Sequence, residues 1–406
     1  MATALLGTAL GCAGLQDLLP GSGLPIETTL TSEQKETAEA LALLVDDDAH
    51  FDYDDRKKLE NADVFLWLAA NKLEEPTVLG AALEGMEERW TTSDSVDDKK
   101  LVNADYHLVV RHHLDAEDTL VLARAIEAST NSLVGENPHG ETVDRIVELA
   151  TLYDGSAGRY AALDELWQLR DWEKQDGPTE AFYQALASDD AYVVSNGLNR
   201  LKYETFNLIR KDDFRTRVLG LLSHDDPGVR GRAATVIGRL AEDGDEEVGT
   251  QLHALLNDPN PYVRGEAAEG LAELKRLSSV HKMIAMLDDS EKASYTLDGW
   301  TKLDGTNGSL YHDASTWSRV DDALLYALVS MTSGMGDDKF EYRKINSETK
   351  DADIALAVKD AQIWYKANVR ELPAADAEDA PERSKARPGR GTAPRERPGG
   401  SRRRPR

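Results

Sequence analysis

The chain has 406 residues, one cysteine and a formal net charge of −27 at pH 7. One cysteine excludes an intramolecular disulfide and any zinc site built on several cysteines. The charge is uneven, because the residues from Arg383 onward include ten Lys or Arg and one Glu, a balance of +9, which leaves −36 for the 382 residues before them. Such an acidic body repels phosphate backbones, which argues against nucleic-acid binding by it.

Residues 1–30 are predicted to be a signal and a tether. An apolar run without Lys or Arg ends at Cys12, and the sequence DLLPGSGLP follows soon after it. The run resembles a bacterial lipobox, which implies that Cys12 is lipidated and that the chain is a membrane-anchored lipoprotein facing the periplasm. No other apolar run approaches the roughly 18 residues of a membrane-spanning helix, so the lipid would be the only anchor. The alternative is an ordinary N-terminus with an incidental thiol.

Residues 31–178 are predicted to be divergent helical hairpins. The sequence LENAD at 59–63 returns as LVNAD at 101–105, 42 positions later, and apolar helical patterns follow both copies. Residues 141–170 supply another helical pair, which is interrupted at Asp154 and Gly155. Periods of this length are typical of stacked helix pairs.

The clearest repeats lie in residues 179–287, with the best copies at 214–240 and 248–274. LLSHDDPGVRGRAATVIGRL at 221–240 returns as LLNDPNPYVRGEAAEGLAEL at 255–274, 34 positions later. Asp226 and Asn260 can cap the N-termini of helices that begin with Pro227 and Pro261. Small alanines in the middle of each apolar face let another helix approach closely. A weaker third copy has Asp190 at the turn but Ala191 in place of proline.

These copies resemble the HEAT repeats of bacterial proteins, including the lyase-type repeats. The residues that carry the resemblance are Asp225, Asp226, Pro227, Val229, Arg230, Ala233, Ala234, Asp258, Pro261, Val263, Arg264, Ala267 and Ala268. The resemblance implies an all-α superhelix, a HEAT or armadillo-type solenoid of stacked antiparallel helix pairs. It also implies that Arg230 and Arg264 bond acidic turn residues of their own or the next repeat, with Asp225 and Asp258 as partners. The alternative is that these arginines face a ligand groove.

Residues 288–370 are predicted to contain an irregular insertion and a helical cap. Gly299, Gly305 and Gly308 lie among polar residues, and helical patterns return at 320–334 and 353–369. The first of these helices, the aromatic turn at Phe340 and Tyr342, and the final helix with Trp364 and Tyr365 resemble the closing segment of bacterial HEAT-repeat proteins. No stretch alternates with period 2 over any length, so almost no sheet is expected.

Residues 371–406 form a tail rich in Arg, Pro and Gly that is predicted to be disordered. Three interpretations stay open: a solvated tail, contact with an acidic partner or with the acidic body, and contact of Arg402, Arg403 and Arg404 with nucleic acid. The tail has no aromatic residue to stack on bases.

No catalytic, cofactor or metal site is predicted, because the chain lacks the HExxH, GxxxxGK[ST], GxSxG and GxGxxG patterns. His107 and His112 do not share a helical face well, so His107, His112 and His113 are interpreted as residues near the end of a helix. The aspartates of residues 46–55 lack the spacing of a calcium loop.

The sequence thus predicts a non-enzymatic scaffold or adaptor that binds a protein partner on its concave surface. The negative charge of the body would favour a basic partner. It is expected to be tethered to the bacterial cell envelope by lipid alone. One alternative is a cytoplasmic scaffold whose basic tail contacts nucleic acid or an acidic partner. Another is an accessory protein to an enzyme, such as a HEAT-type lyase or a cofactor-attachment helper.

Overall fold

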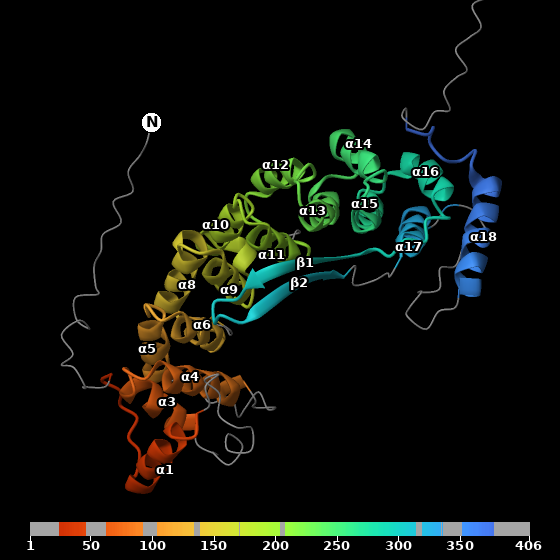
Figure 1. Ribbon diagram of the computed structural model, residues 1–406. Coiled ribbons are helices and arrows are strands. Elements are labelled where there is room, and N and C mark those ends of the chain that lie inside the picture. The colour runs from red at the N-terminus through yellow and green to blue at the C-terminus, as the bar shows by residue number, and fades with distance from the viewer. Residues whose placement is uncertain are drawn as a thin grey trace, which may run out of the picture.

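The structure is a computed structural model that describes residues 24–45, 62–91, 104–133, 139–169, 171–203, 208–313, 319–333, 335 and 351–376. Within these residues the chain is a curved solenoid of stacked helix pairs, as Figure 1 shows. The predicted all-α solenoid is therefore confirmed. Cys12, residues 46–55, Phe340, Tyr342 and residues 402–404 lie outside the described residues.

The described residues of the first half form a series of helices. They are α1 (Ser32–Ala42), α3 (Ala62–Asn71), α4 (Pro76–Thr91), α5 (Ala104–His113), α6 (Thr119–Ala128), the short α7 (Thr130–Leu133), α8 (Gly140–Leu152) and α9 (Ser156–Leu166). Helices α3 and α5 both begin at the alanine of the sequence echo, 42 positions apart. The two echoes therefore begin equivalent helices.

The second half contains the clearest repeats. Its helices are α10 (Asp176–Ala185), α11 (Ala191–Leu201), α12 (Lys211–Leu221), α13 (Pro227–Leu240), α14 (Glu246–Leu255), α15 (Pro261–Glu273), α16 (Val280–Ala285), α17 (Val320–Thr332) and α18 (Asp351–Asn368), with 3-10 turns at Trp172–Lys174 and Leu277–Ser279. The two best repeat copies correspond to the pairs α12–α13 and α14–α15.

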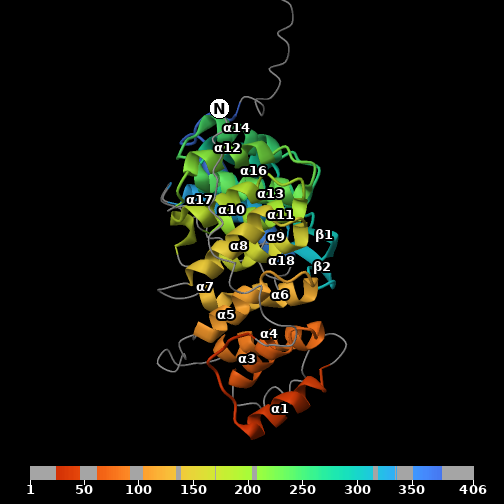
Figure 2. The same ribbon diagram turned by 90° about the vertical axis from the view of Figure 1, so that its left-hand side faces the viewer.

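The helices form two rows along the solenoid. One row, here called the inner row, consists of α4, α6, α9, α11, α13, α15 and α17, each in contact with the next. The outer row, which includes α8, α10, α12, α14 and α16, lies on the convex side (Figure 1), and Figure 2 shows the same stack from its side. Each helix pair thus buries its apolar faces against its neighbours, as a repeat that cannot form a core alone must do.

Polar side chains cap the inner helices where the sequence predicts their start. The Asp226 carboxylate accepts from the backbone N–H of Val229 at 3.0 Å, and the Asn260 side chain accepts from Tyr262 at 2.9 Å. In the weaker copy, Asp190 still caps α11 although no proline follows it. The cap therefore defines the start of the inner helix even where the proline is lost.

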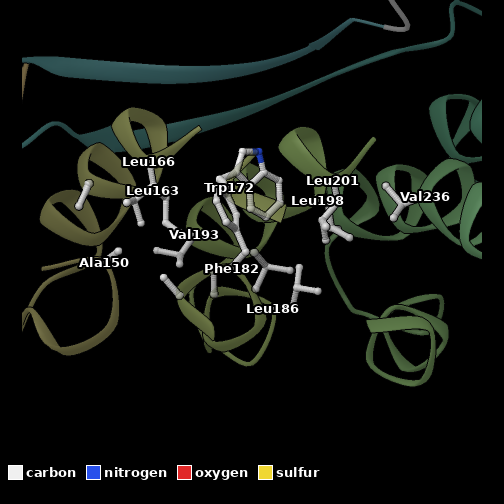
Figure 3. Packing of buried hydrophobic residues seen from close by; sticks show 14 of the residues in the cluster. Ala150, Leu163, Leu166, Trp172, Phe182, Leu186, Val193, Leu198, Leu201 and Val236 are labelled. Carbon is white, nitrogen blue, oxygen red and sulfur yellow. The ribbon is translucent and has the colours of Figure 1, made fainter. Parts of the chain in front are cut away.

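The core lies between the two rows. In Figure 3, Leu163 and Leu166 of α9 and Val193 of α11 point toward side chains of the outer row. Trp172 packs on Phe182 with ring centroids 4.1 Å apart and an interplanar angle of 39°. A contiguous set of buried apolar side chains continues from α1 to α18, so the described helices share one elongated core.

Helices α13 and α15 approach until their backbones touch. Ala233, Ala234, Ala267 and Ala268 are fully buried in this part of the solenoid. A Cβ atom built on Gly238 would overlap the backbone of Gly270, and one built on Gly270 would overlap the carbonyl oxygen of Ala234. The alanines were predicted to allow close approach, but the glycines supply the closest contact.

The insertion is not wholly irregular, because it carries a two-stranded antiparallel sheet. Strand β1 (Ser294–Thr301) pairs with β2 (Asn307–Asp313), and within the described residues the sheet is limited to these two strands. Leu297 lies opposite Leu310 and Trp300 opposite Gly308, so the register shifts between these pairs. Gly299, with φ of +91°, lies within this irregularity. The bulge interrupts period-2 alternation, which explains why the sequence pattern missed the strand.

No helix in the described part of the chain combines the length and the apolar character that crossing a bilayer requires.

The contact between α13 and α15 predicts opposite effects for two matched substitutions of helical glycines. Gly220→Ala on α12 places a methyl group in open space, so its better helix propensity should raise the free energy of unfolding by about 0.5–1 kcal/mol. Gly238→Ala gains the same propensity but overlaps rigid backbone, so it should lower that free energy by about 1–3 kcal/mol or more. Urea unfolding of both variants measures the difference. Equal stabilisation by both would contradict the close contact.

Candidate interaction surface

The hairpin begins and ends at one place in the solenoid. The backbone N–H of Val320 donates to Glu291 at 3.0 Å, and the N–H of Asp321 donates to Asp289 at 2.9 Å. Lys292 and Arg319 also form an isolated antiparallel bridge. The insertion is therefore a long loop between α16 and α17 whose two ends are hydrogen-bonded to each other. At the equivalent position, the preceding two repeats have only a short turn. Residues 294–313 are called the strap below.

The strap runs back along the inner row, as Figures 1 and 2 show. Near its base, the Tyr295 hydroxyl donates to the carboxylate of Asp226, the cap of α13, at 2.8 Å. The Tyr295 ring also lies 6.4 Å from that of Tyr262 on α15. Near its tip, the Asp304 carboxylate interacts electrostatically with Arg124 of α6. The strap thus connects the last repeat with helices far upstream.

Trp300 forms the central attachment of the strap. Its ring centroid lies 4.4 Å from that of Tyr160 on α9 and 5.4 Å from that of Tyr192 on α11. A Cβ atom on Gly308 would overlap the indole, so only glycine at this cross-strand position leaves room for it. Tyr295 and Leu297 are half-buried while Thr296 and Asp298 are exposed. Because the bulge after Leu297 adds one residue to β1, the side chain of Trp300 lies on the same half-buried face as Tyr295 and Leu297.

Three carboxylates lie near the Tyr192 hydroxyl of this attachment. Burial raises the pKa of the Tyr192 hydroxyl, and the carboxylates of Asp298, Asp190 and Asp226 raise it further. Asp190 and Asp226 cap inner helices, whereas Asp298 comes from the exposed face of β1. The three residues near Tyr192, Asp190, Asp226 and Asp298, are together called the strap surface below.

The arginine of the first clear repeat joins successive turns of the solenoid. Arg230 donates from Nε and Nη2 to the Asp258 carboxylate at 3.0 and 3.1 Å. Its Nη1 donates to the backbone oxygens of His224 and Asp225 at 2.8 and 2.9 Å. Asp258 of the next turn is thus the ionic partner, and Asp225 contributes its backbone oxygen.

Arg264 repeats this arrangement one step further along the solenoid. It donates to the carboxylates of Asp289 at 2.8 Å and Glu291 at 2.9 Å, and to the backbone oxygen of Asp258 at 2.9 Å. Each arginine therefore joins its own turn to the next one. The remaining predicted repeat residues, Pro227, Val229, Pro261 and Val263, lie in the first turn of α13 or α15, where both valines are fully buried.

A buried ionic cluster on α11, α13 and α15 was missed by the sequence analysis. Lys202 Nζ lies 3.1 Å from the Glu269 carboxylate, and Arg239 Nη2 lies 3.2 Å from it. Arg239 also pairs with Glu273 at 3.0 Å. Lys202 follows α11, whereas Glu269 belongs to α15, so this contact passes over α13. The cluster ties three successive inner helices together.

Two further members complete the charge balance of this cluster. Thr235 donates to the Glu266 carboxylate at 2.6 Å, and the buried Arg232 interacts electrostatically with Glu266 and Glu269. The three cations, Lys202, Arg232 and Arg239, thus balance three carboxylates. The repeat pattern held the signal, because Arg232 and Arg239 recur 34 positions later as Glu266 and Glu273. Equivalent positions on stacked helices are neighbours, so opposite charges there can pair.

The predicted histidines line a separate groove of about 850 Å³, formed by residues of α4, α5, α6 and α8 and the adjoining turns. His107 stacks on His139 with ring centroids 4.2 Å apart, and the Nε2 atom of His113 lies 2.9 Å from the Ala69 oxygen. Burial lowers the pKa of His107 and of His113 to about 4, so both are neutral near pH 7. Burial also lowers the pKa of His112. Among the described residues, no group of three or more His, Cys, Asp or Glu is arranged to hold a metal ion.

Comparison with known proteins agrees with the repeat pattern. Residues 215–295 match the family of HEAT repeats, a span that runs from α12 to the first residues of β1. No curated protein matches the sequence. The crystal structure of an engineered protein from the Northeast Structural Genomics Consortium is 17% identical, with a TM-score of 0.42, and covers 84% of this chain and 97% of its own. A second engineered protein from that consortium is 15% identical, with a TM-score of 0.29, and covers 76% of this chain and 98% of its own.

Glu165 on α9 is a carboxyl whose titration affects folding. Burial raises its pKa to about 8 from 4.5, although Thr130 donates a hydrogen bond to it, and the nearby Asp164, Glu127 and Glu87 oppose its ionisation further. The folded chain therefore holds this proton more tightly than the unfolded chain does.

The contribution of protonated Glu165 to the free energy of unfolding is therefore fully present below about pH 4.5. It is lost as the pH rises through about 8. Glu165→Gln keeps a neutral group beside Thr130. The variant should be stabilised relative to the natural chain at about pH 8.5, with this advantage much smaller at about pH 5. Urea unfolding at both pH values measures the change. A difference that is the same at both pH values would contradict the raised pKa.

Proposed function

We propose that the protein is a non-enzymatic scaffold that binds a partner protein along the inner row of its HEAT-type solenoid. Stacked helix pairs present a long curved surface, which is how repeat proteins commonly hold extended partners. The observation that carries the proposal is the strap surface, where Asp190 and Asp226 lie near Tyr192 together with Asp298 of the exposed face of β1. Such a surface favours a partner segment rich in Lys or Arg.

The rest of the inner row supports this choice of surface. The arginines of the repeats are paired with carboxylates of the next turn, and the cations Lys202 and Arg239 are paired with glutamates. These ion pairs reduce the positive field that the inner row presents beside the strap. Asp298 lies on the exposed face of β1, so its charge is accessible to a partner.

The proposed partner site predicts a charge-specific loss of binding. Asp298→Lys reverses one charge of the strap surface, and Asp212→Lys makes the same change on the exposed side of outer helix α12. We expect proteins captured by the natural chain from its own cells to be lost with Asp298→Lys and kept with Asp212→Lys. Quantitative mass spectrometry after cross-linking measures this.

Added salt should weaken the same captured set, because exposed charges are screened. Equal capture by both variants would contradict the strap surface as the partner site.

The envelope tether is a separate part of the proposal, and Cys12 carries it. Mass spectrometry of the N-terminus, on protein purified from its native cells, should find a lipidated Cys12 as the first residue. Detergent should then be needed to extract the protein. An unmodified N-terminus in the soluble fraction would contradict the tether.

A cytoplasmic scaffold would then be the better account, with the basic tail after Arg383 as its contact to nucleic acid or to an acidic partner. Removal of residues 383–406 should in that case abolish salt-sensitive binding while the solenoid stays folded. The lyase or cofactor-attachment role would instead require a bound chromophore or an acid–base pair in a groove.

A further inference from the structure

We propose that the strap is a brace that holds the curvature of the solenoid from α6 to α17. In a solenoid each repeat ordinarily contacts only its neighbours, so small rotations between repeats add up along the stack. A segment that bridges distant repeats opposes this accumulation. The strap is such a segment, because it leaves the turn before α17 and reaches α6 (Figure 1).

The attachments of the strap are spaced along the inner row. Tyr295 bonds Asp226 at the start of α13, and Trp300 packs on Tyr192 of α11 and Tyr160 of α9. In sequence, Trp300 and Tyr160 are 140 residues apart. A change in curvature would slide these helices relative to a strand of fixed length. The attachments would then have to break, so curvature and strap contact are coupled.

The brace is separable from the repeat that carries it. The hydrogen bonds of Val320 to Glu291 and of Asp321 to Asp289 join the two ends of the insertion at its base. The turn between α16 and α17 is thus closed before the strands begin. Removal of the strap should therefore leave the pairing of α16 with α17 intact, unlike removal of a core helix.

The test measures distances along the solenoid with pairs of spin labels. In a Cys12→Ser chain, Glu117→Cys beside α6 and Ser330→Cys on α17 place exposed labels at the two ends of the braced region. Replacement of residues 294–317 by a short Gly-Ser turn should broaden this distance distribution and shift it to longer values. Labels at Asp212→Cys and Gln251→Cys, on neighbouring outer helices, should keep the distribution of the natural chain.

A point variant tests the same idea without the deletion. Trp300→Ala should broaden the Glu117–Ser330 distribution in the same direction as the deletion, because the central attachment is lost. Thr296→Ala, on the exposed face of the same strand, should leave the distribution unchanged. Circular dichroism checks that each variant keeps its helix content.

The results decide the proposal in either direction. Broadening with the deletion and Trp300→Ala, but not with Thr296→Ala, supports the brace. An unchanged Glu117–Ser330 distribution in a helical deletion variant overturns it. If the deletion variant loses its helix content, the Trp300→Ala result decides alone, and an unchanged distribution there overturns the proposal equally.

Discussion

The contact of α13 with α15 at Gly238 and Gly270 is the constraint on which the central part of the structure depends. Because neither glycine has a side chain, the two backbones touch. This approach places Arg239 beside Glu269 and Glu273, and allows Lys202 to reach Glu269 past α13. The same close stacking sets the spacing of the N-termini along which the strap lies. A larger residue at either glycine would alter all three arrangements.

The buried ionic cluster has a different physical character from this packing contact. Burial of charges costs solvation energy that ion pairs only partly recover, so such a cluster is weak evidence for stability by itself. Loss of the fully buried Glu266 would nevertheless cost about 3–5 kcal/mol, because it leaves uncompensated buried charge. Here the three cations and three carboxylates come from three successive inner helices. The cluster therefore specifies how those helices align along one another. Apolar packing of small residues alone would define this alignment less well.

The strap changes what the inner row can offer to a partner. A bare solenoid would present its inner helices alone, whereas this chain covers the N-terminal edge of α9, α11 and α13 with its own hairpin. The surface then combines carboxylates of two helix caps with one from β1. These three carboxylates come from residues that are far apart in the sequence, so only the folded chain brings them near one another.

The sequence by itself determined the repeating helix pair, because the 34-residue period, the caps at Asp226 and Asn260 and the buried alanines are local features. The resemblance to HEAT repeats also implied that Arg230 and Arg264 would bond acidic turn residues. Only the tertiary structure decided which turn supplies the carboxylate. Stacking places the carboxylate of Asp258 beside Arg230 and that of Asp289 beside Arg264, so each arginine pairs with the next turn. The strap was equally beyond local patterns. The alternation of its first strand is broken by a bulge. Trp300 contacts Tyr160 and Tyr192 only because the stacked helices bring residues far apart in the sequence close together.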